Sequence, residues 1–222
     1  MKLLRHGDFG KEKPGIIDQE GKIRDLSDHI TDINGGTINA SSLKKIAAID
    51  LSSLPTVSNT TRLGACVGNV GKFLCIGLNY SDHAAESGLP VPSEPILFSK
   101  ATSAIVGPND NVEIPRNSSE TDWEVELGII IGKKAKYINE DDAEDYIAGY
   151  CVVNDVSERA FQIKREGQWT KGKSCDTFGP TGPYLVTKDE IPDVQNLKMY
   201  LDVNGKRMQD GSTNTMIFSA KH

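Results

Sequence analysis

From Lys72 onward, short apolar runs alternate with polar stretches that contain Gly, Pro and Asn. These runs are spaced like the strands of a β-rich domain and unlike the helices of a bundle. We therefore predict a β-rich domain over residues 70–222. Its strands are expected within the segments FLCIGLN, PILFSK, AIVGPND, VEIP, LGIIIG, YIAGYCVVND, GPYLV and MYLDVNG.

The first part of the chain has a different pattern. The segment PGIIDQEGKIRDL predicts two short strands around a Gln-Glu-Gly turn, and SSLKKIAAID predicts a helix. We expect a small α/β domain over residues 1–58, followed by a polar, Pro-containing linker in LSSLPTVSNTTRLG. Together with the β-rich part, this indicates an α+β fold that is rich in strands.

Helical periodicity occurs at two places in the later part of the chain. One is NEDDAEDYIAGY, where Asn139 can cap a helix, and the other is DVSERAFQIKRE. The final segment NTMIFSAKH ends within an apolar run, without a terminating signal. We expect the chain to be shorter than the fold to which it belongs.

The composition narrows the class of protein. With 37% hydrophobic and 25% charged residues, the chain is typical of a soluble globular protein. A net charge of -6 argues against nucleic acid or an anionic membrane as the partner. The chain shows neither a signal peptide nor an apolar run of membrane-spanning length. The four cysteines lack C-x-x-C spacing, which favours reduced thiols and a cytoplasmic protein.

Three acids alternate in the segment ETDWEVELGIIIG. If this segment is a strand, Asp122, Glu124 and Glu126 lie on one face. Like charges at this spacing repel one another, and a bound cation would compensate them. Because the four histidines lack the spacing of a zinc site, oxygen ligands and a hard cation such as Mg²⁺, Mn²⁺ or Ca²⁺ are indicated. The alternative is an exposed strand face with solvated acids.

A further acid, Asp155, directly follows the apolar run of YCVVNDVSER. Ends of strands commonly present functional groups, so Asp155 is a third candidate ligand. Three carboxylates would leave coordination positions of a divalent cation open for substrate and water, which is a catalytic arrangement. The alternative for Asn154 and Asp155 is a helix N-cap or an Asx-turn.

Two other segments carry candidate catalytic side chains. In LNYSDHAAESG, His83 and Glu86 are spaced i, i+3, so in a helix the carboxylate can orient the imidazole as a general base for water. In WTKGKSCDTFGPTGPYLV, Lys171 or Lys173 can bind a carboxylate or offset developing negative charge. Lys100, in ILFSKATSAIVG, is a candidate of the same kind. The alternatives are a solvated helical pair or a structural histidine, and lysines on a surface loop.

Five motifs, in the order of the chain, resemble those of the fumarylacetoacetate hydrolase family: GLNYSDHAAE, PILFSKATSAIVGPND, DWEVELGIIIGK, NDVSERAFQ and GKSCDTFGPTGP. The resemblance extends from Lys72 to the end of the chain. It is most like the bacterial branch labelled ureidoglycolate lyase, or hydrolase of 2,4-diketo-3-deoxy sugar acids. It is also similar to the branch of acylpyruvate hydrolases and oxaloacetate decarboxylases.

The resemblance implies a role for each candidate residue. It implies a β-rich roll of mixed sheets with a small N-terminal domain, assembled as a homodimer. It also implies that family members continue into a Gly-Thr-Pro-rich turn that this chain does not reach. The implied metal ligands for Mg²⁺ or Mn²⁺ are Glu124, Glu126 and Asp155, with Asp122 as a neighbour; the water-activating dyad is His83 and Glu86; the substrate- and charge-stabilising residues are Lys100, Arg159, Gln162 and Lys173.

The expected activity is hydrolysis of a C–C bond in a small 2,4-dioxo acid, such as an acylpyruvate or a diketo-deoxy sugar acid. The substrate would chelate the metal, His83 with Glu86 would activate water, and Lys173 would offset the charge of a metal-stabilised enolate. The alternatives are a decarboxylase, an isomerase or a ureidoglycolate lyase of the same family. A non-catalytic, truncated family member is the alternative from another class.

Overall fold

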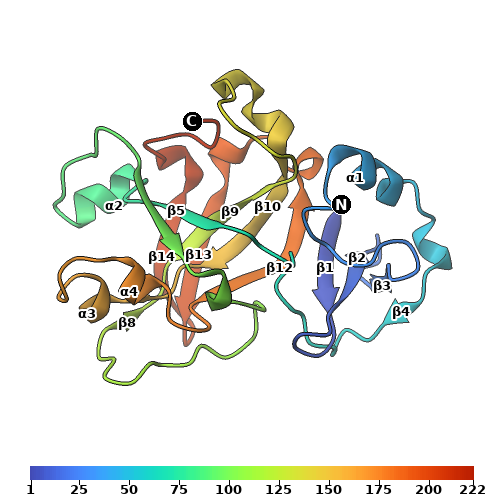
Figure 1. Ribbon diagram of the computed structural model, residues 1–222, viewed down its shortest axis with the longest axis horizontal. Helices are drawn as coiled ribbons and strands as arrows, with labels where there is room; N and C mark the ends of the chain where they lie inside the picture. Colours follow the sequence, from blue (N-terminus) through green and yellow to red (C-terminus); the bar gives the residue numbers. More distant parts are fainter.

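The computed structural model describes all 222 residues. Its largest sheet is built from β1 (Lys2–His6), β2 (Lys13–Ile17), β3 (Ile23–Asp25), β4 (Thr56–Val57), β7 (Ile105–Val106), β9 (Val125–Ile131), β10 (Ile147–Asn154) and β12 (Gly179–Thr187). The strand order is β4-β3-β2-β1-β12-β10-β9, and β7 pairs with β12 in parallel while all other pairs are antiparallel (Figure 1).

The elements predicted for the N-terminal part are confirmed. β2 and β3 form a hairpin, and Gly21 occupies the turn with φ +78°, a conformation that glycine adopts without strain. The predicted helix is α1 (Ala40–Ala47), whose first turn is capped by Asn39: its side-chain oxygen accepts the Ser42 N–H at 3.0 Å. These elements depend on local sequence signals.

The N-terminal and the larger part share one sheet and one core. β1 pairs with β12, with Leu3 opposite Leu185. Buried residues from both parts form one apolar cluster: Leu3, Ile16, Leu26, Ile33, Ile38, Ile46, Leu54, Cys66, Val67, Ala148, Cys151, Val153 and Leu185. The division into domains over residues 1–58 and 70–222 stays a prediction, with a continuous sheet across it.

Three two-stranded ribbons flank the large sheet. They lie on the side opposite to β1 to β4, where α2, α3 and α4 are also found (Figure 1). The ribbons are β5 (Phe73–Gly77) with β6 (Ile96–Lys100), β8 (Thr121–Asp122) with β11 (Ser157–Glu158), and β13 (Lys198–Val203) with β14 (Lys206–Ser212). The remaining α-helices are α2 (Ser81–Glu86), α3 (Arg159–Gln162) and α4 (Thr170–Lys173). Six 3₁₀ helices lie at Leu51–Ser53, Thr102–Ala104, Glu140–Tyr146, Lys188–Glu190, Val194–Asn196 and Thr213–Thr215.

Most of the expected strands are found, and three expectations need correction. The segment VEIP is not a strand. In NEDDAEDYIAGY the helical part is a 3₁₀ helix, Glu140–Tyr146, because Ile147 already pairs with β9. In DVSERAFQIKRE the chain first forms β11 and then the short helix α3. In both cases a long-range strand pairing overrides local helical periodicity.

A close approach of β10 and β12 fixes the centre of the sheet. At Gly149 an added Cβ atom would lie 2.1 Å from the Val186 carbonyl oxygen, so only glycine fits. β10 is buried along most of its length, which explains its nearly continuous apolar sequence. None of the helices combines the length and the apolar character needed to cross a bilayer.

Candidate metal and substrate site

Glu124 and Asp155 lie next to each other, and each occupies a short gap between two strands. Glu124 lies between β8 and β9, and Asp155 lies between β10 and β11. The Asp155 N–H donates to the Glu124 carbonyl at 2.8 Å, and the Glu124 N–H donates to the Asn154 side-chain oxygen at 3.1 Å. The expectation of one continuous strand carrying three acids is therefore wrong, because the chain passes from one sheet to another at Trp123–Glu124.

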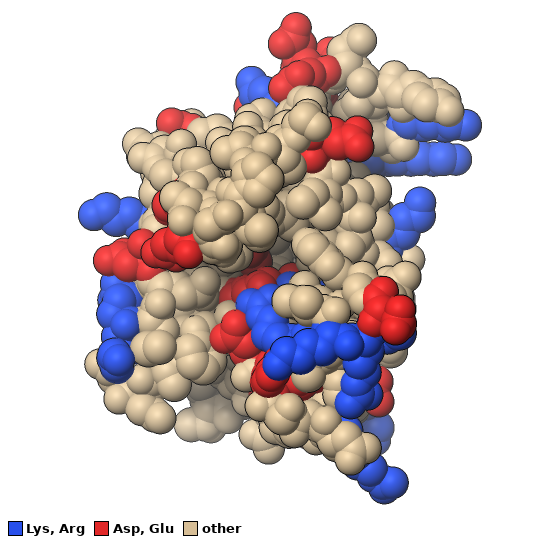
Figure 2. Space-filling view, turned by 90° about the vertical axis from the view of Figure 1, so that its left-hand side faces the viewer, with Lys and Arg blue, Asp and Glu red and all other residues tan.

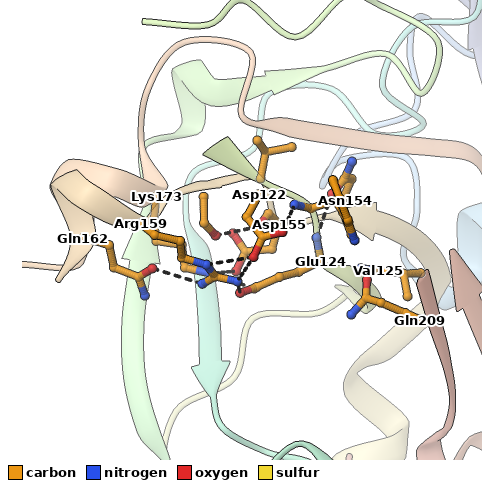
Figure 3. A network of polar contacts seen from close by, with 12 residues as sticks. Asp122, Glu124, Val125, Asn154, Asp155, Arg159, Gln162, Lys173 and Gln209 are labelled. Carbon is orange, nitrogen blue, oxygen red and sulfur yellow. Dashed lines mark hydrogen bonds and ion pairs between the residues drawn. The ribbon is translucent and has the colours of Figure 1, made fainter. Parts of the chain in front are cut away.

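Two buried lysines bind these carboxylates (Figure 3). The Lys173 ammonium lies 2.7 Å from Glu124 Oε2 and 2.8 Å from Asp155 Oδ2. The Lys100 ammonium lies 2.6 Å from Asp155 Oδ1 and donates to the Val156 carbonyl at 3.0 Å. Both lysines are 2% exposed, so they are not the solvated surface lysines that were the alternative for Lys100 and Lys173.

The charges in this cluster stabilise one another. Burial alone would raise the pKa of Asp155, but Lys100 and Lys173 outweigh it and hold the pKa below its ordinary value. Burial lowers the pKa of Lys100, and Asp155 opposes that effect. Removal of one partner would leave a buried charge without compensation, which is costly.

Arg159 extends the network towards a surface of the protein. Its Nη2 atom lies 2.6 Å from Glu124 Oε1 and 2.8 Å from Asp122 Oδ2, and its Nη1 donates to Gln162 Oε1 at 3.1 Å. Asp122 is thus a partner of Arg159, and its expected place outside the ligand set stays a prediction. Figure 3 shows Gln162, Arg159 and Glu124 in a row.

Tight packing of α3 against α4 places Arg159 and Lys173 in this network. At Gly172 an added Cβ would lie 2.4 Å from the Glu158 carbonyl oxygen, so a side chain would force the two helices apart. The Lys173 ammonium also lies 5.1 Å from the centre of the Phe98 ring, a favourable cation–π distance. Lys171, on the same helix, is exposed and remains a surface lysine.

Glu126 is the acid that lacks a cation. No ion pair within 4.0 Å involves its carboxylate, whereas Glu124 and Asp155 each have two. Burial, followed by repulsion from Glu124 and Asp155, raises the pKa of Glu126 to about 8. The Tyr80 hydroxyl, next to α2, contacts this carboxylate and partly opposes the increase in its pKa. Glu126 therefore keeps its proton at neutral pH in the metal-free protein, and its ionised form would need a further cation.

The donor set suits a hard divalent cation. Glu124, Glu126 and Asp155 offer only carboxylate oxygens, the ligands that Mg²⁺ and Mn²⁺ prefer. As the side chains lie, no three acidic, histidine or cysteine residues are grouped to hold an ion, and the Lys173 ammonium lies between Glu124 and Asp155. The residues fit a cation in type and charge once the Lys173 ammonium withdraws from one of its two carboxylates.

His83 and Glu86 lie outside this cluster. Both are exposed on α2, at the expected helical spacing, and no hydrogen bond or ion pair joins their side chains. Tyr80, which precedes α2, contacts Glu126 and thus places the helix beside the acids. The dyad and the catalytic role of Lys173 stay predictions, and so do the substrate-binding roles of Lys100, Arg159 and Gln162.

Three residues that contact the acids, or the residue between Glu124 and Glu126, were not identified from the sequence. Tyr80 lies within the GLNYSDHAAE motif, and Asn154 was considered only as a cap or turn residue. Gln209, on β14, accepts the Val125 N–H at 2.8 Å. Its strand lies in a polar segment without a predicted element, so no signal in the sequence pointed to it.

Figure 2 views the molecule from the side of α2, α3 and α4 and shows a hollow near the middle of this face, with acidic and basic side chains gathered at its lower rim.

Comparison with known proteins identifies related chains. The family model described as "Fumarylacetoacetate (FAA) hydrolase C-terminal" matches residues 72–222. A protein of Burkholderia orbicola (strain MC0-3), provisionally named a hydrolase, is 59% identical over 219 residues, covering 99% of this chain and 78% of that protein.

Two solved structures show the same fold over the whole chain. Fumarylacetoacetate hydrolase from the psychrophilic Exiguobacterium antarcticum is 31% identical with a TM-score of 0.81, covering 100% of this chain and 78% of that chain. Maleylpyruvate hydrolase from Sphingobium sp. SYK-6, solved with manganese(II) and pyruvate, is 24% identical with a TM-score of 0.81, covering 100% and 80%. The second likeness shows the shared fold alone. The expected α+β, β-rich roll is confirmed.

Proposed function

The chain belongs to the fumarylacetoacetate hydrolase family, and we propose that it is a divalent-metal-dependent hydrolase of a small 2,4-dioxo acid. The bond broken is the C–C bond between C3 and C4 of an acylpyruvate or a diketo-deoxy sugar acid. The observation that carries this proposal is the buried cluster in which Glu124 and Asp155 are paired with lysines while Glu126 has no cation.

The metal, Mg²⁺ or Mn²⁺, is held by Glu124, Glu126 and Asp155. When bound, it polarises the carboxylate and 2-oxo oxygens of the substrate and lowers the energy of negative charge that develops beside them. Lys100 keeps Asp155 ionised and in place, because it is fully buried and donates to that carboxylate.

Arg159 and Gln162 bind the substrate. Both lie on α3 and already share a hydrogen bond, so the guanidinium presents its N–H groups in a fixed orientation. A planar guanidinium suits a carboxylate or a pair of oxo oxygens. We assign the activation of the water molecule that attacks the 4-oxo carbon to His83, which lies on α2 one helical turn after Tyr80.

His83 takes a proton from a water molecule, whose oxygen bonds to the 4-oxo carbon, while Glu86 orients the imidazole. The C3–C4 bond then breaks, and its electron pair remains on the fragment with the 2-oxo acid as an enolate. The Lys173 ammonium offsets that charge. Transfer of the proton to C3 completes the reaction and gives a carboxylic acid and a 2-oxo acid.

The absence of a contact between His83 and Glu86 favours a second candidate. In decarboxylation or isomerisation no water molecule attacks a carbonyl carbon, so neither reaction needs a His83–Glu86 pair that activates water. Reaction in H₂¹⁸O separates the candidates. Hydrolysis places the label in a new carboxylic acid, decarboxylation releases CO₂, and isomerisation yields neither product.

The test begins with protein stripped of metal by a chelator. Its melting temperature is measured during titration with Mg²⁺ or Mn²⁺, with and without oxalate as a mimic of the 2-oxo acid, and acylpyruvates are then offered as substrates. Ligands that bind only the folded state raise the melting temperature. We expect Glu126→Ala to abolish the metal response and turnover, and Glu113→Ala, which removes an exposed acid, to leave both unchanged. Turnover at the parent rate by Glu126→Ala protein would refute the proposal.

A further inference from the structure

Gln209 contacts the site from a part of the chain to which the proposed function assigns no residue. It lies on β14, where it is half-buried while its neighbours Lys206, Arg207, Met208 and Asp210 are exposed. Its side-chain oxygen accepts the Val125 N–H at 2.8 Å. Figure 3 shows Gln209 and Arg159 on opposite sides of the chain at Glu124.

The Val125 N–H has no partner in the large sheet. β9 is the last strand of that sheet, and the N–H and carbonyl of Glu124 both bond towards β10 and the residue after it. Successive peptide groups in a strand point to opposite sides, so the Val125 N–H points to the open edge. Gln209 therefore takes the place of a missing neighbouring strand at the residue between Glu124 and Glu126.

The residues that follow Gln209 contact the segment that carries His83. Thr215 donates to Asp82 Oδ1 at 3.2 Å, and the Phe218 N–H donates to Asn79 Oδ1 at 2.9 Å. These contacts fix the start of α2, on which His83 lies. One stretch of ten residues, from 209 to 218, thus touches both the strand of the acids and the helix of the predicted base.

We propose that Gln209 is a positioning residue. It fixes the first residue of β9, sets the separation of the Glu124 and Glu126 carboxylates, and couples them to α2 through the segment 209–218. The proposal rests on the proposed function for its chemistry, since the carboxylates that it positions are those that would hold the metal. Partners that orient metal ligands from behind change metal affinity by 10- to 100-fold when they are removed.

Gln209→Leu removes the acceptor and keeps the approximate size of the side chain, whereas Gln209→Glu keeps an acceptor oxygen. Met208→Leu, on the neighbouring exposed position, is the matched control. Two quantities are measured on the full chain after metal removal. One is the Mn²⁺ concentration that gives half of the maximal rise in melting temperature. The other is the rate of amide hydrogen exchange in peptides that cover Val125 and residues 79–86.

We expect Gln209→Leu to raise the half-maximal Mn²⁺ concentration about tenfold or more and to accelerate exchange in both peptides. Gln209→Glu restores the Mn²⁺ response to within about threefold of the parent or better, and Met208→Leu behaves as the parent. If Gln209→Leu left the half-maximal Mn²⁺ concentration unchanged, the proposal would be overturned. Gln209 would then contribute to the stability of the fold without positioning the carboxylates.

A parent chain without any Mn²⁺ response would instead count against the proposed function. In that case the rate of amide hydrogen exchange decides whether Gln209 is a positioning residue. Faster exchange in residues 79–86 of the Gln209→Leu protein supports the coupling to α2, and an effect confined to Val125 refutes it.

Discussion

Lys173 is the side chain whose removal most directly tests the electrostatics of the site. Its ammonium, 3% exposed as a side chain, bridges Glu124 and Asp155 at 2.7 and 2.8 Å. Lys173→Met keeps an unbranched chain of similar volume, so it removes the charge with little change in packing. Glu124 would keep Arg159 and Asp155 would keep Lys100.

The expected loss of stability follows from burial. Removal of one partner from a buried ion pair costs about 3–5 kcal/mol when the remaining charge is left uncompensated. We expect the lower end of this range, because Arg159 and Lys100 still pair with the two acids. For a chain of this size, each kcal/mol lowers the melting temperature by about 2–4 °C. We therefore expect metal-free Lys173→Met protein to melt about 10 °C below the parent, by combination of these two ranges.

A second prediction is that Mn²⁺ stabilises the Lys173→Met variant more than it stabilises the parent. In the variant the carboxylates have lost a competing cation, so Mn²⁺ should raise the melting temperature of Lys173→Met protein more than that of the parent. The assay is urea and thermal unfolding at pH 7, with chelator or with Mn²⁺. Lys171→Met, which changes an exposed lysine of the same helix, should stay within about 0.5 kcal/mol of the parent. Metal-free Lys173→Met protein as stable as the parent would refute the reasoning, because the bridge would then contribute nothing.

Three further predictions concern the metal-free protein. The pKa of Glu126 is raised from 4.5 to about 8, so the fold loses stability as the pH rises from 4.5 towards 8. Glu126→Gln should therefore increase the free energy of unfolding in urea by about 3 kcal/mol at pH 7 and by almost nothing at pH 4.5. An equal increase at both pH values would contradict this. Burial lowers the pKa of His6 below 6.5, so stability is lost as the pH falls from 6.5 through the lowered value, and His6→Gln should flatten this loss in urea midpoints measured between pH 7.5 and 5. Gly149→Ala would place its Cβ 2.1 Å from the Val186 carbonyl and should cost about 3 kcal/mol in urea unfolding, whereas Gly71→Ala, with open space around the added Cβ, should leave the midpoint unchanged.

The sequence predicted the parts of the fold that depend on neighbouring residues. The hairpin of β2 and β3 has a glycine at its turn, and the stretch SSLKKIAAID has helical periodicity, so both elements were predicted. The 3₁₀ helix at Glu140–Tyr146 was expected to be longer, because nothing local marks Ile147 as a partner of Ile131. Long-range pairing cannot be read from the periodicity of one segment.

The same distinction holds in the candidate site. Asp155, Lys100 and Lys173 were selected by residue type at the ends of apolar runs or in Gly-rich segments, and the structure brings all three into one buried network. Their partnership depends on three segments that are distant in the sequence. Gln209 could not be selected, since its importance arises only from the orientation of one amide on an edge strand.

The alternation of acids in ETDWEVELGIIIG suggested three equivalent side chains on one face, but its meaning is different. The break at Trp123–Glu124 assigns each acid a different environment: Asp122 faces Arg159, Glu124 lies between Arg159 and Lys173, and Glu126 has no cation. A continuous strand would have placed three like charges in one row, where each would have raised the pKa of the next. Because strand pairing is interrupted at Glu124 and at Asp155, Arg159 of α3 and Lys173 of α4 can approach the acids. They compensate Asp122 and Glu124, and Glu126 remains without a cation. It is this unequal compensation, rather than the number of acids, that makes the cluster suited to a divalent cation.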